Sequence, residues 1–324
     1  MSLIEVREIT KHFPVRKGFL SRDQRVVHAV DAVDMNIHAE ETLALVGESG
    51  CGKTTLGRLV LRLIEPTSGT IRLEGEEITS FNHRQMQSIR PKMQMIFQDP
   101  TASLNPRKTI RQILSDPLLV HERCDKDELE ERATELLEMV QLTPPSMYLN
   151  RYPHEFSGGQ RQRIVIARAI ALWPRFIFAD EPVASLDVSV RGGILKLMQA
   201  LQDRLSISYL FVTHDLSVVR SISHRVAIMY LGQIVERAET NRLFEAPKHP
   251  YTNAILSATP IPNPQRARMR SRIILQGDLP SPINPPAGCR FHTRCPQAKH
   301  VCAQEQPPTV ETETGHTVAC WLYA

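Results

Sequence analysis

The sequence predicts an α/β fold in which helices cover a mainly parallel sheet, and three short apolar runs carry this prediction. They occupy residues 42–46, 176–179 and 209–213 and have the length and composition of buried strands. Helix-like segments follow the first two runs, with apolar residues recurring every three or four positions. Strands and helices that alternate along a chain in this way are typical of a parallel sheet.

Further elements are expected around this core. Short apolar runs separated by polar turns in residues 1–40 predict an antiparallel β layer. Residues 83–160 predict a mostly helical subdomain, because an apolar stripe at helical spacing continues among charged residues. Residues 225–236 predict a hairpin that turns at Gly232-Gln233.

The overall composition restricts the class of partner. The chain has 324 residues with 39 basic and 35 acidic side chains, a net charge of +4. This excess is too small to indicate a nucleic-acid partner, which is usually marked by a concentrated basic face. The N-terminal segment carries scattered charges rather than a signal peptide, and no apolar run approaches the length of a membrane span. We therefore expect a cytosolic protein whose connection to any membrane runs through a partner.

The composition changes after residue 258, where prolines and arginines crowd the chain. This change predicts a first domain at 1–258 and a Pro-rich linker with a small cysteine-bearing domain at 259–324. Four cysteines in a tail with little apolar material predict a metal staple; they are Cys289, Cys295, Cys302 and Cys320. The sequence lacks the closely spaced cysteine pairs of structural zinc sites. Zinc, an iron–sulfur cluster and free buried thiols all stay open.

A phosphate-binding loop is predicted between the first buried strand and the helix that follows it. The segment GESGCGKTT fits the pattern G-x-x-x-x-G-K-[ST] and comprises Gly47, Glu48, Ser49, Gly50, Cys51, Gly52, Lys53, Thr54 and Thr55. Its glycines let backbone N–H groups turn toward phosphate, and the helix adds its positive end. Lys53 can reach the β- and γ-phosphates, and the Thr54 hydroxyl can bind Mg²⁺. Cys51 is interpreted as a spacer. The sequence therefore predicts a P-loop NTPase.

Two carboxylates end the second buried strand. Asp180 is at the tip of the apolar run Ile177 to Ala179, and Glu181 follows it. A carboxylate at this place can hold the Mg²⁺ shell, and its neighbour can polarise the attacking water as a general base. We assign the first role to Asp180 and the second to Glu181.

The segment FSGGQRQR resembles the signature motif of the ABC ATPases, and the other motifs of that family are present in the family's order. In this resemblance, residues 47–54 match Walker A, and Asp180-Glu181 matches Walker B. The signature comprises Ser157, Gly158, Gly159 and Gln160, and single matches are Gln98 of the Q-loop, Asp187 of the D-loop and the switch histidine His214. Phe13 resembles the aromatic residue that stacks on adenine.

The resemblance implies a head-to-tail dimer in which two ATPases hold ATP and Mg²⁺ between them. The signature residues of one subunit would close over the γ-phosphate held by the other, with N–H donors at a helix N-terminus. Catalysis would rest on Glu181, on His214, which contacts the γ-phosphate and orients the water, and on Gln98, which touches Mg²⁺. Closure and opening of the dimer would drive a permease.

A closer resemblance covers nearly the whole chain. QDPTASLNPR (98–107), NRYPHEFSGGQ (150–160), HPYTNAILSATP (249–260) and LPSPINPPAGCRFHTRCP (279–296) are similar to the oligopeptide/dipeptide importer ATPases, and most similar to the second of their two ATPases. This implies a heterodimer with a sister ATPase, two transmembrane permease subunits and a substrate-binding protein, at the cytoplasmic face of the inner membrane. It also favours a [4Fe–4S] cluster at the four tail cysteines.

Three other functions are weighed against peptide import. Importers of nickel or glutathione share these ATPase features, because selectivity resides in other subunits. ABC ATPases that act on ribosomes or DNA typically carry two cassettes or long coiled-coil insertions, and this chain has one cassette without such an insertion. A redox-sensing interaction subunit would use the tail alone, but the presence of Glu181 and His214 favours an active ATPase.

Overall fold

The computed structural model describes residues 2–15, 25–122, 124–258 and 273–324, which form two compact units. Unit 1 contains residues 37–42 and 80–212 with the start of the chain, and unit 2 contains residues 4–36, 43–79 and 213–324. The arginine-bearing part of the predicted linker, at 259–272, lies outside the described residues.

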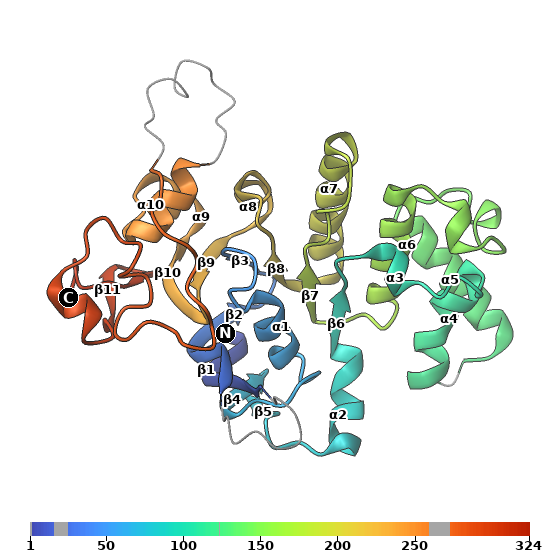
Figure 1. Ribbon diagram of the computed structural model, residues 1–324. Coiled ribbons are helices and arrows are strands. Elements are labelled where there is room, and N and C mark those ends of the chain that lie inside the picture. The colour runs from blue at the N-terminus through green and yellow to red at the C-terminus, as the bar shows by residue number, and fades with distance from the viewer. Residues whose placement is uncertain (1, 16–24, 123, 259–272) are drawn as a thin grey trace. The chain divides into compact units, whose positions relative to one another are not determined.

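Unit 1 holds three parallel strands, which are labelled in Figure 1. They run in the order β8 (Ser208–Val212), β7 (Phe176–Asp180) and β6 (Met93–Ile96). Every residue of β7 and β8 is buried, as expected for strands covered on both faces. The strands predicted from residues 176–179 and 209–213 are confirmed. The region 83–160, expected to be mostly helical, also contains the strand β6, because a four-residue apolar run does not distinguish strand from helix.

The rest of that predicted helical region is confirmed as mostly helical. Side chains of Asn82, Thr109, Asp125 and Ser157 cap the N-termini of four of the helices by accepting backbone N–H bonds. The helices of unit 1 are α2 (His83–Ile89), α3 (Pro100–Ser103), α4 (Ile110–His121), α5 (Lys126–Met139), α6 (Gly158–Ile170) and α7 (Val188–Leu205), with short 3-10 turns η1 (Arg90–Lys92), η2 (Pro145–Met147) and η3 (Pro153–Glu155).

The first sheet of unit 2 carries the predicted hairpin. It runs in the order β11 (Thr309–Glu313), β12 (His316–Ala319), β10 (Gln233–Glu239), β9 (Arg225–Tyr230) and β3 (Thr42–Val46). β3 and β9 are parallel, and the other pairs are antiparallel. The hairpin turns at Leu231-Gly232, one residue earlier than predicted, and both residues have positive φ.

The predicted antiparallel layer is the second sheet of unit 2. Its order is β2 (Val26–His38), β1 (Ser2–Pro14), β4 (Ser68–Leu73) and β5 (Glu76–Glu77). β1 pairs antiparallel with β4, with Ile4 opposite Leu73. The layer therefore includes residues 68–77, which were not predicted to belong to it.

The cysteine tail shares the core of unit 2. Phe291 is buried among side chains of β9, β10 and α10 (Pro250–Ser257), and helices α8 (Leu216–Ile222) and α9 (Thr240–Glu245) complete this core. Glu236 of β10 and His316 of β12 are both buried, and a carboxylate oxygen of Glu236 lies 2.7 Å from Nε2 of His316. The tail hairpin is therefore joined to the sheet by a buried polar contact. The short 3-10 turn η4 (His300–Ala303) lies in this tail.

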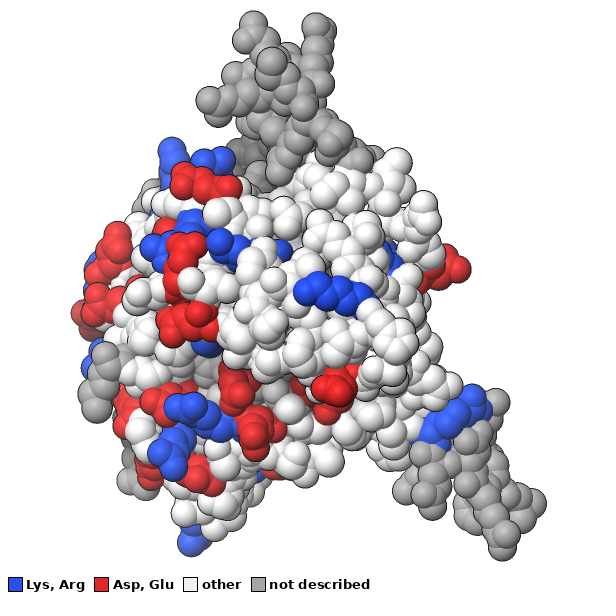
Figure 2. All heavy atoms as spheres, turned by 90° about the vertical axis from the view of Figure 1, so that its left-hand side faces the viewer, with Lys and Arg blue, Asp and Glu red and all other residues white. Residues whose placement is uncertain are grey.

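The charges on the surface and the lengths of the helices agree with what the composition predicts, namely no concentrated basic face and no membrane span. On the face drawn in Figure 2, Lys and Arg side chains alternate with Asp and Glu among the residues that are described. No helix in the described part of the chain combines the length and the apolar character that crossing a bilayer requires.

Candidate functional site

The predicted phosphate-binding loop connects β3 to α1 (Lys53–Val60) in unit 2. Close backbone packing requires two of its glycines. A Cβ on Gly47 would lie 2.2 Å from the Met229 carbonyl oxygen, and one on Gly52 would lie 2.1 Å from that of Ala29. Gly52 also has φ of 109°, which L residues with a side chain rarely adopt. The loop is therefore held tightly by β2 and β9, and the first turn of α1 follows it.

Lys53 lies inside this loop and is 7% exposed. Its ammonium group donates to the Gly47 carbonyl at 2.8 Å and to the Glu48 carbonyl at 2.9 Å. Cys51 is also buried, and burial raises the pKa of its thiol above the usual value, although Lys53 opposes the shift. A thiol in this state is a poor nucleophile at neutral pH, which agrees with a spacer role.

Glu48 of the loop is held by residues from later in unit 2. Its backbone N–H donates to the Tyr251 hydroxyl at 3.0 Å. One guanidinium nitrogen of Arg294 donates to both carboxylate oxygens of Glu48, at 3.0 and 3.1 Å. The loop is thus contacted directly by the cysteine tail, which the sequence did not predict.

Two other predicted nucleotide-site residues belong to unit 2. His214 is the second residue after the end of β8, and its side chain is exposed. The next residue, Asp215, caps α8 by accepting a hydrogen bond from the Ser217 N–H. Phe13 lies near the end of β1 and is 37% exposed, with the Lys11 ammonium 5.0 Å from its ring centroid. The ring is exposed, as stacking on a base requires. The adenine-stacking role of Phe13 stays a prediction.

In unit 1 the structure brings Gln98 and Glu181 together. The Gln98 side-chain amide donates to a carboxylate oxygen of Glu181 at 3.0 Å. Glu181 has φ of 47°, and its backbone N–H donates to the Val212 carbonyl at 3.0 Å. Asp180, the last residue of β7, is 4% exposed. A non-glycine residue held in the left-handed region at a strand end is typical of functional sites.

The signature residues lie at the N-terminus of α6. Ser157 caps this helix and forms a reciprocal capping box with Gln160, with bonds of 3.3 and 3.0 Å. A Cβ on Gly159 would lie 2.6 Å from a methyl carbon of Val190, in the first turn of α7. Gly158 and Asp187, the residue that precedes α7, are both exposed. The signature and the D-loop therefore lie side by side on the surface of unit 1.

The four tail cysteines all lie in residues 289–320 of unit 2, which we call the tail lobe. Burial, together with the nearby Cys302, Cys320 and Cys295, raises the pKa of the Cys289 thiol to about 11. The Cys289 N–H donates to the Cys302 carbonyl at 2.8 Å. Among the described residues, no three of these thiols come within 4.8 Å of one another.

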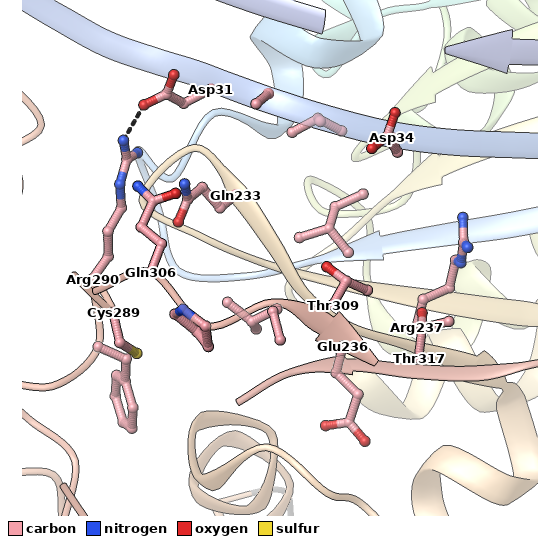
Figure 3. Close-up of a pocket in the computed structure, with 17 residues that line it drawn as sticks. Asp31, Asp34, Gln233, Glu236, Arg237, Cys289, Arg290, Gln306, Thr309 and Thr317 are labelled. Carbon is pink, nitrogen blue, oxygen red and sulfur yellow. Dashed lines mark hydrogen bonds and ion pairs between the residues drawn. The ribbon is translucent and has the colours of Figure 1, made fainter. Parts of the chain in front are cut away.

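A second group of possible metal ligands is formed by His12, His28 and Asp31, whose ligand atoms lie within 4.8 Å of one another. Figure 3 shows Arg290 of the tail reaching the carboxylate of Asp31 beside a cavity of about 200 Å³ that Cys289 also lines. Because Arg290 already neutralises this carboxylate, the group is better described as an ion-pair network than as a metal site.

The residues that sequence reasoning missed are Arg290, Arg294 and Tyr251. Their contacts join positions far apart in the chain, such as Glu48 and Arg294, and no local periodicity indicates them. For the two arginines, the available signal was the segment CRFHTRC, in which they stand between two cysteines.

Comparison with known proteins identifies the family. The ABC transporter family matches residues 30–184, and the C-terminal region of oligopeptide/dipeptide transporters matches residues 235–302. The oligopeptide transport ATP-binding protein AppF of Bacillus subtilis (strain 168) is 48% identical over 324 residues, which are 100% of this chain and 98% of AppF. The fold is similar to the ATP-binding cassette MJ0796, solved as a dimer with ADP and phosphate (TM-score 0.65, 28% identity, 73% of this chain and 98% of that one). It is also similar to CbiO1 of Clostridium perfringens, part of an ABC transporter complex (TM-score 0.65, 25% identity, 76% and 91% of the two chains). The chain therefore belongs to the ATP-binding proteins of ABC transporters, in the oligopeptide/dipeptide transporter family.

Proposed function

We propose that this protein is the ATP-hydrolysing subunit of an ABC importer that takes up di- and oligopeptides. The observation that carries the proposal is the glycine-packed loop at the start of α1, with buried Lys53 inside it, in a chain 48% identical to an oligopeptide transport ATP-binding protein along its whole length. A loop of this kind binds the phosphates of a nucleotide through backbone N–H groups and a lysine.

Each motif residue has a role toward ATP in this proposal. Lys53 binds the β- and γ-phosphates, Thr54 and Asp180 hold Mg²⁺, and Phe13 stacks on adenine. Gln98 touches Mg²⁺ and, through its 3.0 Å bond, orients Glu181 as the general base for the attacking water. His214 contacts the γ-phosphate.

Hydrolysis is coupled to transport through a dimer. The exposed N-terminus of α6, with Ser157, Gly158 and Gly159, donates to the γ-phosphate held by a sister ATPase, and Asp187 lies beside it on the same surface. The pair acts on two transmembrane permease subunits from the cytoplasmic face of the inner membrane, and a substrate-binding protein delivers the peptide. The similarity to an oligopeptide transport protein over the whole chain supports peptides as the substrate class.

Reconstitution of the complete transporter tests this function. The chain, its sister ATPase and the two permease subunits are placed in proteoliposomes, and the binding protein is added with a peptide, nickel or glutathione. We expect the peptide-loaded binding protein to stimulate ATP hydrolysis and to drive peptide uptake. Stimulation by nickel or glutathione alone would contradict the substrate class, and ATP hydrolysis that no ligand stimulates would contradict the transport role.

The four tail cysteines hold a metal centre in the same proposal, and a [4Fe–4S] cluster is the form that the resemblance to the oligopeptide/dipeptide importer ATPases favours. Such a centre cross-links a lobe that has few apolar residues of its own. On anaerobically purified protein we expect iron and a visible charge-transfer absorbance, both lost in Cys302→Ser but kept in Cys124→Ser, which changes a cysteine of unit 1. Protein that contains neither iron nor zinc would contradict the metal centre.

A further inference from the structure

The tail segment Cys289–Cys295 contacts the phosphate-binding loop in unit 2. Arg294 bridges both carboxylate oxygens of Glu48, and its side chain is only 11% exposed. The same guanidinium nitrogen lies 3.5 Å from the Tyr230 hydroxyl. Since Tyr251 accepts the Glu48 N–H, Glu48 is held at both its backbone and its side chain.

A second path joins the segment to the same loop. Arg290 donates to the Leu231 carbonyl and pairs with Asp31. The next residue of that turn, Gly232, donates its N–H to the Cys51 carbonyl at 2.8 Å. The two arginines of the segment are thus connected to two different residues of the loop, Glu48 and Cys51.

Aromatic packing fixes the segment between these arginines. Phe291 is buried, and its ring centroid lies 5.2 Å from that of Tyr230 and 5.4 Å from that of Tyr251. Buried aromatic pairs of this geometry stabilise one arrangement of the rings. The segment therefore cannot shift without moving the residues that contact the loop.

The charge of Glu48 explains why this contact matters for nucleotide binding. Glu48 is acidic and lies in a loop that receives a polyphosphate, and its carbonyl contacts the Lys53 ammonium at 2.9 Å. An unpaired carboxylate there repels the phosphates, and partial burial strengthens that repulsion. Arg294 neutralises the carboxylate and holds it in place.

We propose that Arg294 is a positioning residue of the nucleotide site, through which the cysteine tail sets the affinity of the phosphate-binding loop for ATP. The inference rests on the ATP-binding role proposed above. It adds that the tail regulates the same ATP-binding site. A displacement of residues 289–295 alters ATP affinity, because Arg294 and Phe291 hold this segment against Glu48 and Tyr251.

A double-mutant cycle tests the pair in the full-length chain, with the dissociation constant of ATP measured by displacement of a fluorescent analogue. We expect Arg294→Gln to weaken ATP binding about three- to tenfold, because Glu48 is left unpaired. Arg294→Lys should recover part of the loss. The double variant Glu48→Gln/Arg294→Gln should bind ATP more tightly than Arg294→Gln alone, since it removes the repelling charge.

The matched control is Arg72→Gln, which removes an arginine of the same unit that pairs with Glu77 in the antiparallel layer, outside the tail and the loop. In the reconstituted transporter, Arg294→Gln should raise the KM for ATP and leave kcat at saturating ATP unchanged. Equal ATP affinity in Arg294→Gln and Arg72→Gln, with normal binding by the wild type, would overturn this inference alone. If the wild type binds no ATP, the proposed function itself fails. If Arg294→Gln does not fold, Arg294→Met, which keeps the length of the side chain without its charge, provides the test, and an unchanged dissociation constant for that variant contradicts the inference.

Discussion

Replacement of Glu181 by Gln should reduce ATP hydrolysis by about two to four orders of magnitude, the usual contribution of a general base, while ATP binding persists. The change removes the carboxylate that accepts a proton and keeps the shape of the side chain. The hydrogen bond at 3.0 Å from Gln98 can be retained, because an amide oxygen accepts as a carboxylate does. Steady-state phosphate release by the assembled transporter measures the first effect, and ATP titration measures the second.

The same variant should accumulate the ATP-bound dimer with the sister ATPase, because the contact made by ATP is no longer removed. Size-exclusion chromatography with ATP and Mg²⁺ detects this complex. The matched control is Glu131→Gln, which makes the same chemical change on the exposed surface of α5 in unit 1. Wild-type turnover in the Glu181 variant would show that another group accepts the proton.

The local parts of the site could be predicted because a few adjacent residues carry each of them. β3, β7 and β8 are apolar runs whose residues are all buried, so the strands and the motif at the end of each were visible in the sequence. The end of α1 was less predictable. The apolar spacing continues to Ile64, but the helix ends at Val60, and Arg62 has φ of 52°. Spacing alone does not locate the residue at which a helix terminates.

The contact between the tail and the phosphate-binding loop could not be predicted in this way. Glu48 and Arg294 are 246 positions apart, and their pairing follows from the order of the strands in unit 2. Phe291 is a lone aromatic residue among polar ones, so no period marks it as part of a core, yet it is 1% exposed. Sequence patterns report the face that an element buries, whereas the partner of that face depends on topology.

Replacement of Lys53 by Ala should weaken ATP binding by about a hundredfold or more, since charge-assisted hydrogen bonds to two phosphates are lost together. Lys53 is 7% exposed and donates to the Gly47 and Glu48 carbonyls, so its ammonium group lies within the loop itself. Calorimetric titration with ATP measures the loss, and hydrolysis by the assembled transporter should disappear with it.

A loss of ATP binding in Lys53→Ala has two possible causes, the loss of a charge that attracts phosphate and a change in the loop that Lys53 holds. Lys108→Ala is the control for removal of a lysine, since Lys108 in unit 1 pairs with Asp116 at 2.8 Å and belongs neither to the loop nor to the tail. Lys53→Arg keeps the positive charge but changes its shape, and it should bind ATP more tightly than Lys53→Ala if phosphate attraction dominates. Equal affinities in Lys53→Arg and Lys53→Ala would mean that loop geometry, rather than the charge of Lys53, controls ATP binding. ATP binding by Lys53→Ala at wild-type affinity would contradict the assignment of this loop as the phosphate site.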